Sequence, residues 1–211
     1  MDYIKKPMEI ETRSMEIIAP HLAPFHLNDV ETKVYSRIIH AAGDVEYAPL
    51  IHIHPDAIAA AQNALKAGAN IYTDVEMVRT GINKRKLATF GGEVHCRVAA
   101  PDIAKTAKER GITRSMAAMR AFGKALGGSI VAIGNAPTAL YEVLSLAEKE
   151  NIRPACIIGI PVGFVGAADS KEALRKNPFV PYITVEGTKG GSPIAAAVVN
   201  ALMYDIDNTR V

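Results

Sequence analysis

Cysteine, tryptophan and long apolar runs are scarce or missing in this sequence. It has two cysteines, Cys96 and Cys156, no tryptophan, and an aromatic content of only 6%. Two distant cysteines without a CxxC spacing form neither a disulfide framework nor a metal knuckle, and they are typical of a reducing cytoplasm. No apolar run approaches the roughly 20 residues that a membrane helix needs. The charged residues 1–6 also lack the apolar stretch that follows the start of a signal peptide.

An excess of charge of one sign is missing as well. The chain carries 24 Lys and Arg against 22 Asp and Glu, which gives a formal net charge of +2. The basic residues are scattered and are not interleaved with aromatic residues, a pattern that argues against nucleic-acid binding. We therefore expect a cytoplasmic protein that binds neither nucleic acid nor membrane. Its 49% hydrophobic residues suffice for one substantial core.

The signatures of several common chemistries are also absent. No GxGxxG follows a predicted strand, since the loop at Gly159 is GxxxGxxG, and GxxxxGK[ST], HExxH and GxSxG do not occur. These absences argue against nucleotide, zinc and serine-hydrolase chemistry. An enzyme with this inventory needs a reaction that runs without a redox cofactor, a metal or a covalent nucleophile. We therefore expect no cofactor.

What the sequence does contain is an alternation of helix-like and strand-like segments. Alternation of this kind predicts a parallel sheet between two layers of helices. We predict a single α/β domain over residues 1–211, with a doubly wound, mostly parallel sheet and helices on both faces. The predicted helices are 8–18, 30–42, 55–67 and stretches near 113–126, 136–149, 170–176 and 193–204; the predicted strands are 70–72, 94–98, 129–133, 155–160 and 182–185.

Three of the predicted strands run into glycine-rich loops, at residues 134–138, 161–168 and 187–192. One such loop by itself is most simply a tight turn. Three loops at the carboxyl edge of one parallel sheet favour a large binding surface, because ligands of such sheets bind at that edge. Backbone N–H groups and helix N-termini would face the ligand there.

Several segments carry a family resemblance: RSMEII (13–18), SRIIHAAGDVEY (36–47), TDVEMVRTGI (73–82), TRSMAAMRAF (113–122), GNAPTAL (134–140), GIPVGFVGAADSK (159–171) and GTKGGSPIAAAVVNAL (187–202). These segments resemble the precorrin-8X methylmutase family. The likeness spans nearly the whole chain. It implies an isomerase that moves a methyl group between adjacent carbons of ring C in a late corrin precursor, giving hydrogenobyrinic acid, or cobyrinic acid when cobalt is present. It also implies a homodimer with the tetrapyrrole buried near the subunit interface.

The resemblance implies that His40 is the catalytic residue. A methyl shift within a conjugated macrocycle needs a proton at ring C, and a histidine suits this general-acid role. The end of the predicted helix 30–42 favours a positive charge there, whereas Arg37 opposes it. Asp44 either orients the imidazole or is a solvated loop carboxylate. Without the resemblance, His40 would be a packed or surface histidine. Many relatives carry a cysteine where this chain has Ala42, so no thiol takes part here.

Further residues of the matching motifs imply substrate contacts. Arginine forks and other polar groups suit the many carboxylates of the macrocycle. Ser14 and Arg37 match family positions that contact the substrate. Met77 and Phe164 are interpreted either as apolar surface for the ring or as ordinary core. The remaining candidates, for which a surface or capping role is the alternative, are Thr73, Asp74, Arg79, Arg114, Ser115 and Lys189.

Three alternatives were weighed against this interpretation. His52 and His54 have a spacing compatible with metal binding, but no third ligand accompanies them, and we expect turn histidines and no metal site. A corrinoid carrier of the same fold would bind the tetrapyrrole without rearranging it, although a carrier does not need the proton donor His40. A nucleotide-dependent oxidoreductase would be supported by the fold pattern alone, which is a weak argument for function.

Overall fold

A central β-sheet organises the structure, a computed structural model that describes residues 4–207. Within these residues the chain forms one six-stranded sheet in the order β1-β6-β5-β4-β2-β3. Strands β2 to β6 are parallel, and β1 pairs antiparallel with β6 at one edge. The strands are β1 Ile51–Ile53, β2 Ile71–Thr73, β3 Val94–Cys96, β4 Ile130–Ile133, β5 Cys156–Gly159 and β6 Tyr182–Val185.

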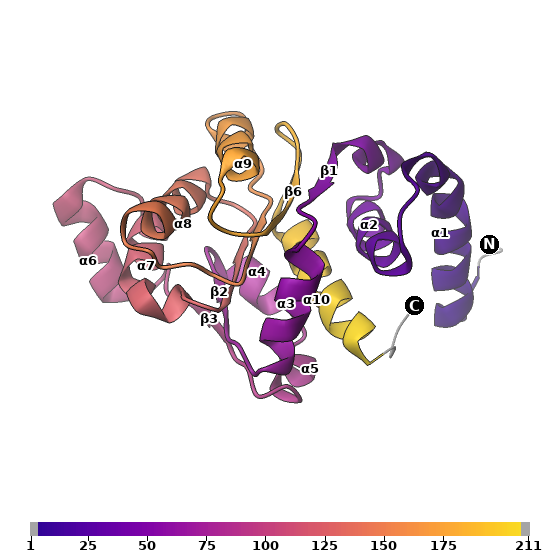
Figure 1. Cartoon of the computed structure of the whole chain (residues 1–211), viewed down its shortest axis with the longest axis horizontal. Coiled ribbons are helices and arrows are strands. Elements are labelled where there is room, and N and C mark those ends of the chain that lie inside the picture. The colour runs from indigo at the N-terminus through magenta and orange to yellow at the C-terminus, as the bar shows by residue number, and fades with distance from the viewer. Residues whose placement is uncertain (1–3, 208–211) are drawn as a thin grey trace.

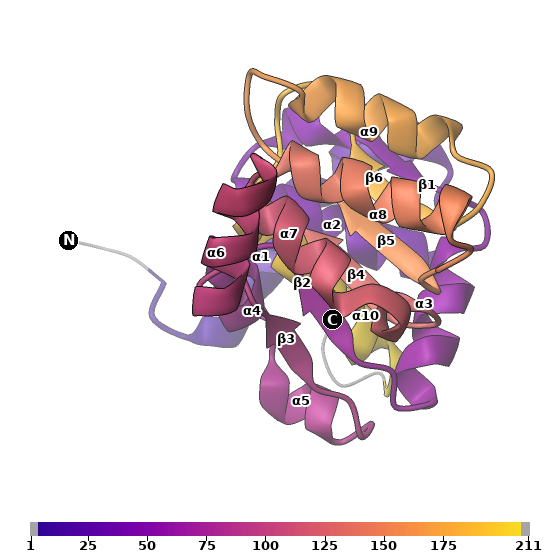
Figure 2. The ribbon, with the colours of Figure 1, turned by 90° about the vertical axis from the view of Figure 1, so that its left-hand side faces the viewer.

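Helices cover both faces of this sheet. Figure 1 shows α1 at one end of the molecule and α6 at the other. Figure 2 shows α7, α8 and α9 in front of the strands and α1, α2 and α10 behind them. The prediction of a doubly wound, mostly parallel α/β fold is confirmed. The helices are α1 Pro7–Leu22, α2 Asp29–Ala42, α3 Ala57–Lys66, α4 Glu76–Gly81, α5 Lys84–Ala88, α6 Pro101–Arg110, α7 Arg114–Phe122, α8 Pro137–Lys149, α9 Ala167–Lys176 and α10 Ser192–Ile206, with 3-10 turns at Ala23–Phe25, Val45–Leu50 and Gly123–Leu126.

Successive residues of each central strand point into two different cores. In β4, Ile130 and Ala132 belong to the core that includes residues of α2, α3 and α10. Val131 and Ile133 belong to the core that includes residues of α7 and α8. Because both faces are covered, the strands consist of continuous apolar residues and do not alternate with polar ones.

Helix α2 begins and ends as the sequence predicts. Asn28 Oδ1 accepts the Glu31 N–H at 2.9 Å, and Glu31 Oε2 accepts the Asn28 N–H at 3.0 Å, which completes a capping box. Gly43, with φ of 64°, ends the helix in the left-handed conformation that glycine adopts without strain. These two ends determine where the last turn of α2, which carries His40, lies.

Some elements differ from the prediction. Helices α4, α5 and α6 and the edge strand β1 were not predicted, and His52 lies in β1 where a turn was expected. Helix α6 has proline at its first position and Gly111 after its end, but it buries only Ile103 and Ala107, so its apolar pattern is weak. The predicted strand 94–98 is shorter, and the helix expected at 170–176 already begins at Ala167.

Candidate active site

His40 lies in the last turn of α2, at the side that faces α10. The residues before it, Ile38 and Ile39, are buried in the core, whereas the His40 side chain is exposed. It lines a shallow hollow together with Arg37 and Ala41 of α2 and three residues of α10: Ala197, Asn200 and Tyr204. The structure therefore brings His40 and Arg37 together, as their spacing of one helical turn predicts.

The α10 side of this hollow is fixed by hydrogen bonds to the segment between α4 and α5. Asn200 Oδ1 accepts the Asn83 N–H at 2.9 Å, and Asn200 Nδ2 donates to the Gly81 carbonyl at 2.9 Å. Asn83 Nδ2 donates to the Tyr204 hydroxyl at 2.8 Å. Asn200 and Tyr204 were not selected from the sequence. A polar asparagine within the apolar helix 193–204 was the signal that could have found them.

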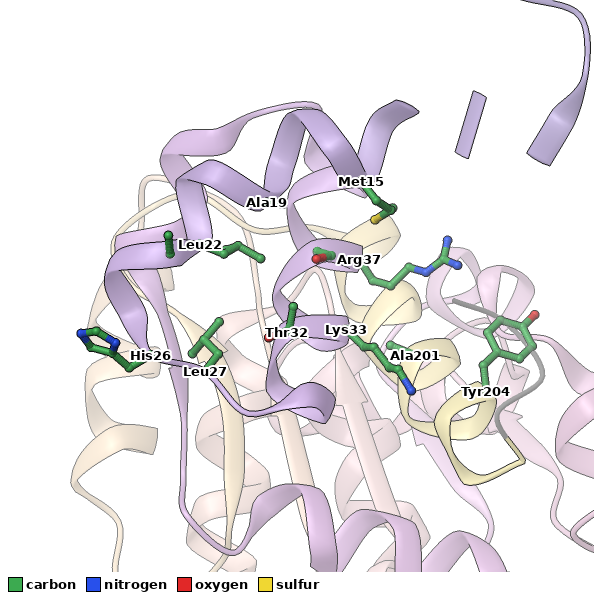
Figure 3. A pocket seen from close by; sticks show the side chains of 12 residues that line it. Met15, Ala19, Leu22, His26, Leu27, Thr32, Lys33, Arg37, Ala201 and Tyr204 are labelled. Atoms are coloured by element: carbon green, nitrogen blue, oxygen red, sulfur yellow. The ribbon is translucent and has the colours of Figure 1, made fainter. Parts of the chain in front are cut away.

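A second, larger cavity adjoins the hollow and shares Arg37 and Tyr204 with it. Its volume is about 370 Å³, within the range of roughly 300–1,000 Å³ typical of ligand pockets. Figure 3 shows Arg37, Lys33 and Tyr204 toward one end and His26 at the other. The lining comes mainly from α1 and α2 and comprises Met15, Ala19, Leu22, Ala23, His26, Leu27, Thr32, Lys33, Ser36, Arg37, Ala201 and Tyr204.

Arg37 forms an ion pair with Glu11 of α1. Ser14, one turn after Glu11 in the same helix, donates its hydroxyl to the Ile10 carbonyl at 2.8 Å. Glu11 thus occupies part of the Arg37 guanidinium that the sequence assigned to substrate carboxylates. A carboxylate ligand of Arg37 would compete with Glu11.

Lys189 reaches the turn that follows α2. Its Nζ donates to Asp44 Oδ2 at 2.7 Å, and it lies 5.2 Å from the centroid of the Tyr47 ring. Asp44 also accepts the Glu46 N–H at 2.9 Å. The hydrogen bond from Lys189 holds the pKa of the Asp44 carboxyl below its usual value, and the same bond raises the pKa of Lys189. Asp44 is therefore a partly exposed loop carboxylate that binds Lys189, which is close to the second of the two roles that the sequence left open for it.

Thr73, Asp74 and Ser115 are buried and interact with the backbone. The Asp74 carboxylate accepts the N–H groups of residues 134, 135 and 136 at 3.1, 2.9 and 2.7 Å. Burial raises the pKa of this carboxyl, and the three N–H groups act in the opposite direction. Thr73 donates to the His95 carbonyl at 3.2 Å, and the Ser115 hydroxyl lies 3.5 Å from the Asp74 carbonyl. In this structure Asp74 holds the β4–α8 loop in place.

Arg79 and Arg114 do not line the His40 hollow. Arg79 Nε bonds Glu76 Oε2 at 2.5 Å within α4. Arg114 is exposed at the start of α7 and lines a different hollow, against α6. Of the predicted site residues, the structure therefore brings Arg37 to His40 and gathers Thr73, Asp74 and Ser115 near the β4–α8 loop.

The loops after β5 and β6 lie side by side. Gly191 N–H donates to the Ile160 carbonyl at 2.9 Å, and Gly163 N–H donates to the Thr188 carbonyl at 3.1 Å. The tip of the first loop is strongly exposed, with Phe164 at 96% and Val165 at 90%. Met77 is 65% exposed, so neither Met77 nor Phe164 belongs to the core, the second of the two interpretations that the sequence allowed.

Metal-binding side chains do not gather into a cluster within residues 4–207. No three His, Cys, Asp or Glu side chains lie close enough there to share a metal ion. His52 Nε2 lies 2.9 Å from Glu186 Oε2, and His54 Nδ1 accepts the Asp56 N–H at 3.2 Å. Within the same residues, no helix has the length and apolarity that crossing a membrane requires.

The fold and the site together define an α/β protein with a candidate ligand site at α2, α10 and the neighbouring loops. Two exposed histidines, His26 and His40, the basic side chains of Lys33 and Arg37, and an apolar cavity make up this site. Comparison with known proteins identifies the family. The sequence profile of the precorrin-8X methylmutase family matches residues 9–205, and the chain belongs to this family. It is therefore an enzyme of the isomerase class, a methylmutase.

Individual relatives agree with this assignment. The chain is 41% identical to the cobalt-precorrin-8 methylmutase of Priestia megaterium, over 96% of this chain and 90% of the relative. It is 43% identical to the precorrin-8X methylmutase of a Sinorhizobium species, over 95% and 96% of the two chains. The solved structure of precorrin-8X methylmutase from Thermus thermophilus superimposes with a TM-score of 0.85 at 36% identity, covering 96% of this chain and 99% of that one.

The role of Asp74 as the anchor of the β4–α8 loop can be tested by Asp74→Asn. We expect the variant to lose about 2 kcal/mol or more of unfolding free energy. The NH2 group of asparagine is a donor, so it cannot accept the backbone N–H groups that a carboxylate oxygen of Asp74 accepts. Urea unfolding would measure the loss. Asp56→Asn, an identical change at an exposed position, is the control and should be nearly neutral. Equal stability of the two variants would contradict the anchoring role.

Proposed function

We propose that this protein moves a methyl group on ring C of precorrin-8X or cobalt-precorrin-8, giving hydrogenobyrinic or cobyrinic acid in cobalamin biosynthesis, with His40 as general acid. The observation that carries the proposal is the exposed His40 ring in a hollow beside Arg37. A general acid must lie within hydrogen-bond distance of its substrate. An exposed ring can make this contact, whereas a histidine enclosed in the core cannot. The names of the relatives, which include both substrate forms, support the reaction.

The charges around His40 suit a proton donor. The ring lies at the carboxyl end of α2, where the helix dipole favours a positive charge. Arg37, one turn earlier, would oppose that charge, but Glu11 pairs with it and balances it. An isomerisation leaves the composition of the substrate unchanged. The proton that His40 gives to ring C must therefore leave again after the methyl group has moved.

Basic side chains near the hollow are suited to the carboxylates of the substrate. Lys33 and Arg37 line the adjoining cavity, and Lys189 lies at the turn that follows α2. Ser14 adds a hydroxyl on the facing helix. We assign direct carboxylate contacts to Arg37, Lys189 and Ser14 and, farther out, to Arg79 and Arg114. Thr73, Asp74 and Ser115 act by holding the loop and strand ends beneath the site.

A homodimer is part of the proposal. Phe164 and Val165 project from the β5–α9 loop with almost their whole side chains exposed, and large apolar groups in such a position mark an interaction surface. We infer that the tetrapyrrole and a partner subunit cover this tip. Sedimentation velocity should give a dimer, and a fully active monomer would contradict the inference. The free Cys96 and Cys156 support the cytoplasm as the compartment.

Replacement of His40 tests the central role. His40→Ala should lower the turnover rate at least 100-fold, because a general acid contributes about 10²–10⁴-fold. Tetrapyrrole binding and folding should be largely preserved. The measurement is the change in the absorption spectrum of the tetrapyrrole during a single turnover.

His21→Ala, at an exposed position of α1, is the control and should keep full activity. Full activity of His40→Ala would refute the assignment. A wild-type protein that binds the tetrapyrrole but leaves its spectrum unchanged would instead favour the corrinoid carrier.

The competition between Glu11 and the substrate for Arg37 gives a two-sided prediction. Arg37→Ala should weaken tetrapyrrole binding about tenfold or more, since a charged hydrogen bond is worth about 1.5–3 kcal/mol. Glu11→Gln should strengthen binding, because Glu11 then competes less strongly for Arg37 and one repelling carboxylate is gone. Fluorescence or absorbance titration measures both dissociation constants. Arg110→Ala, at the exposed end of α6, is the control. Unchanged affinity in both site variants would contradict the anchor role.

A further inference from the structure

Lys171 of α9 is a buried cation for which the reaction scheme has no role. Its side chain is completely buried, at 0% exposure. Lysine is almost never fully buried without a partner, because the loss of hydration of an ammonium group is costly. Among residues 4–207 no carboxylate forms an ion pair with it, and its Nζ instead donates to the backbone carbonyl of Lys189 at 2.5 Å. The free-energy cost of burying the Lys171 ammonium indicates that this charge has a role in the protein.

The contact partner of Lys171 lies in the loop that serves the His40 site. The carbonyl of Lys189 accepts the hydrogen bond from Lys171, while Lys189 Nζ donates to Asp44 Oδ2 at 2.7 Å. Asp44 follows Gly43, the residue that ends α2 after His40. One residue, Lys189, therefore connects the buried ammonium beneath the loop with the end of the catalytic helix.

The backbone around this contact leaves little freedom. Gly190 has a φ of 154°, and a Cβ at this position would lie 2.6 Å from the Ile160 carbonyl oxygen. The N–H of Gly191 donates to that same carbonyl at 2.9 Å. The loops after β5 and β6 thus pack backbone to backbone. Lys171 adds a hydrogen bond to the backbone of the second loop. An ammonium donor makes a stronger bond to a carbonyl than a neutral donor does, more so away from water.

We propose that Lys171 is a positioning residue of the His40 site: by holding the carbonyl of Lys189 it places the Lys189 ammonium against Asp44 and so fixes the turn that ends α2. This inference deepens the proposed function and rests on it only where turnover is concerned. Burial lowers the pKa of the Lys171 ammonium to about 8, so most of the groups are still charged near neutral pH. A residue that served only to fill space in the core would not need this charge.

The coupling of Lys171 to Asp44 can be measured without the substrate. The carboxyl carbon of Asp44, followed by NMR during an acid titration, reports the pKa that Lys189 holds below its usual value. Lys171→Met should raise this midpoint toward the ordinary value of an aspartate. Lys189→Met should raise it too, because that change removes the donor to Asp44 itself. Lys176→Met, an exposed lysine of the same helix, should leave it unchanged. An unchanged Asp44 midpoint in folded Lys171→Met, with a raised midpoint in Lys189→Met, would overturn the proposal.

Lys171→Gln keeps an N–H donor without the charge and serves as a second variant if the methionine variant does not fold. It should raise the Asp44 midpoint less than Lys189→Met does, and a midpoint equal to the wild-type value would likewise overturn the proposal.

Turnover then tests the link to His40. Lys171→Met should lower kcat about tenfold, and the double variant Lys171→Met/Asp44→Asn should be no slower than Asp44→Asn alone, because both changes act through one connection. Additive losses would show that Lys171 acts by another route. If the wild-type protein shows no turnover, the proposed function fails, while the titration of Asp44 still decides whether Lys171 positions Lys189.

Discussion

The packing of α2 on α10 is the constraint on which the rest of the site depends. Val34 and Ile38 of α2 and Val198 and Leu202 of α10 belong to the same fully buried core, which α10 connects to the sheet. With this face buried, the rotation of α2 about its axis is fixed. Arg37 and His40 then both line the hollow against α10. A single helix orientation thus sets the positions of His40 and Arg37, the proposed proton donor and the proposed carboxylate-binding group, together.

Two buried charges of opposite sign bond the backbone of two loops at the carboxyl edge of the sheet. Asp74 accepts three backbone N–H groups of the β4–α8 loop, and Lys171 donates to a carbonyl of the β6–α10 loop. Each charge is costly to bury, but its bonds to the backbone are stronger than those of a neutral group. The burial of these two charges costs folding free energy, and their bonds hold the backbone of the two loops in place. Both residues act at the carboxyl edge of the sheet, where α/β proteins bind ligands.

The fold was readable from the sequence where burial is strong and regular. The apolar strands β4 and β5 and the capped helix α2 were predicted nearly to the residue, because each has a clear pattern and defined ends. Helix α6 was not predicted, because it is mostly polar and its apolar pattern is weak. In the site, the proximity of Arg37 and His40 followed from helical spacing. The pairing of Lys189 with Asp44 joins residues 145 positions apart, and no local pattern encodes it. The burial of Lys171 contradicts the usual behaviour of lysine and is visible only in three dimensions.

In the proposed reaction, the exposed imidazole of His40 delivers a proton to the bound macrocycle. The most direct measurement is a crystal structure of the protein with the rearranged tetrapyrrole bound. The account predicts a His40 ring nitrogen within about 2.6–3.2 Å of ring C or of a bridging water, and Arg37 turned from Glu11 to a ligand carboxylate. A His40 ring remote from the macrocycle, with the Arg37–Glu11 pair intact, would contradict it.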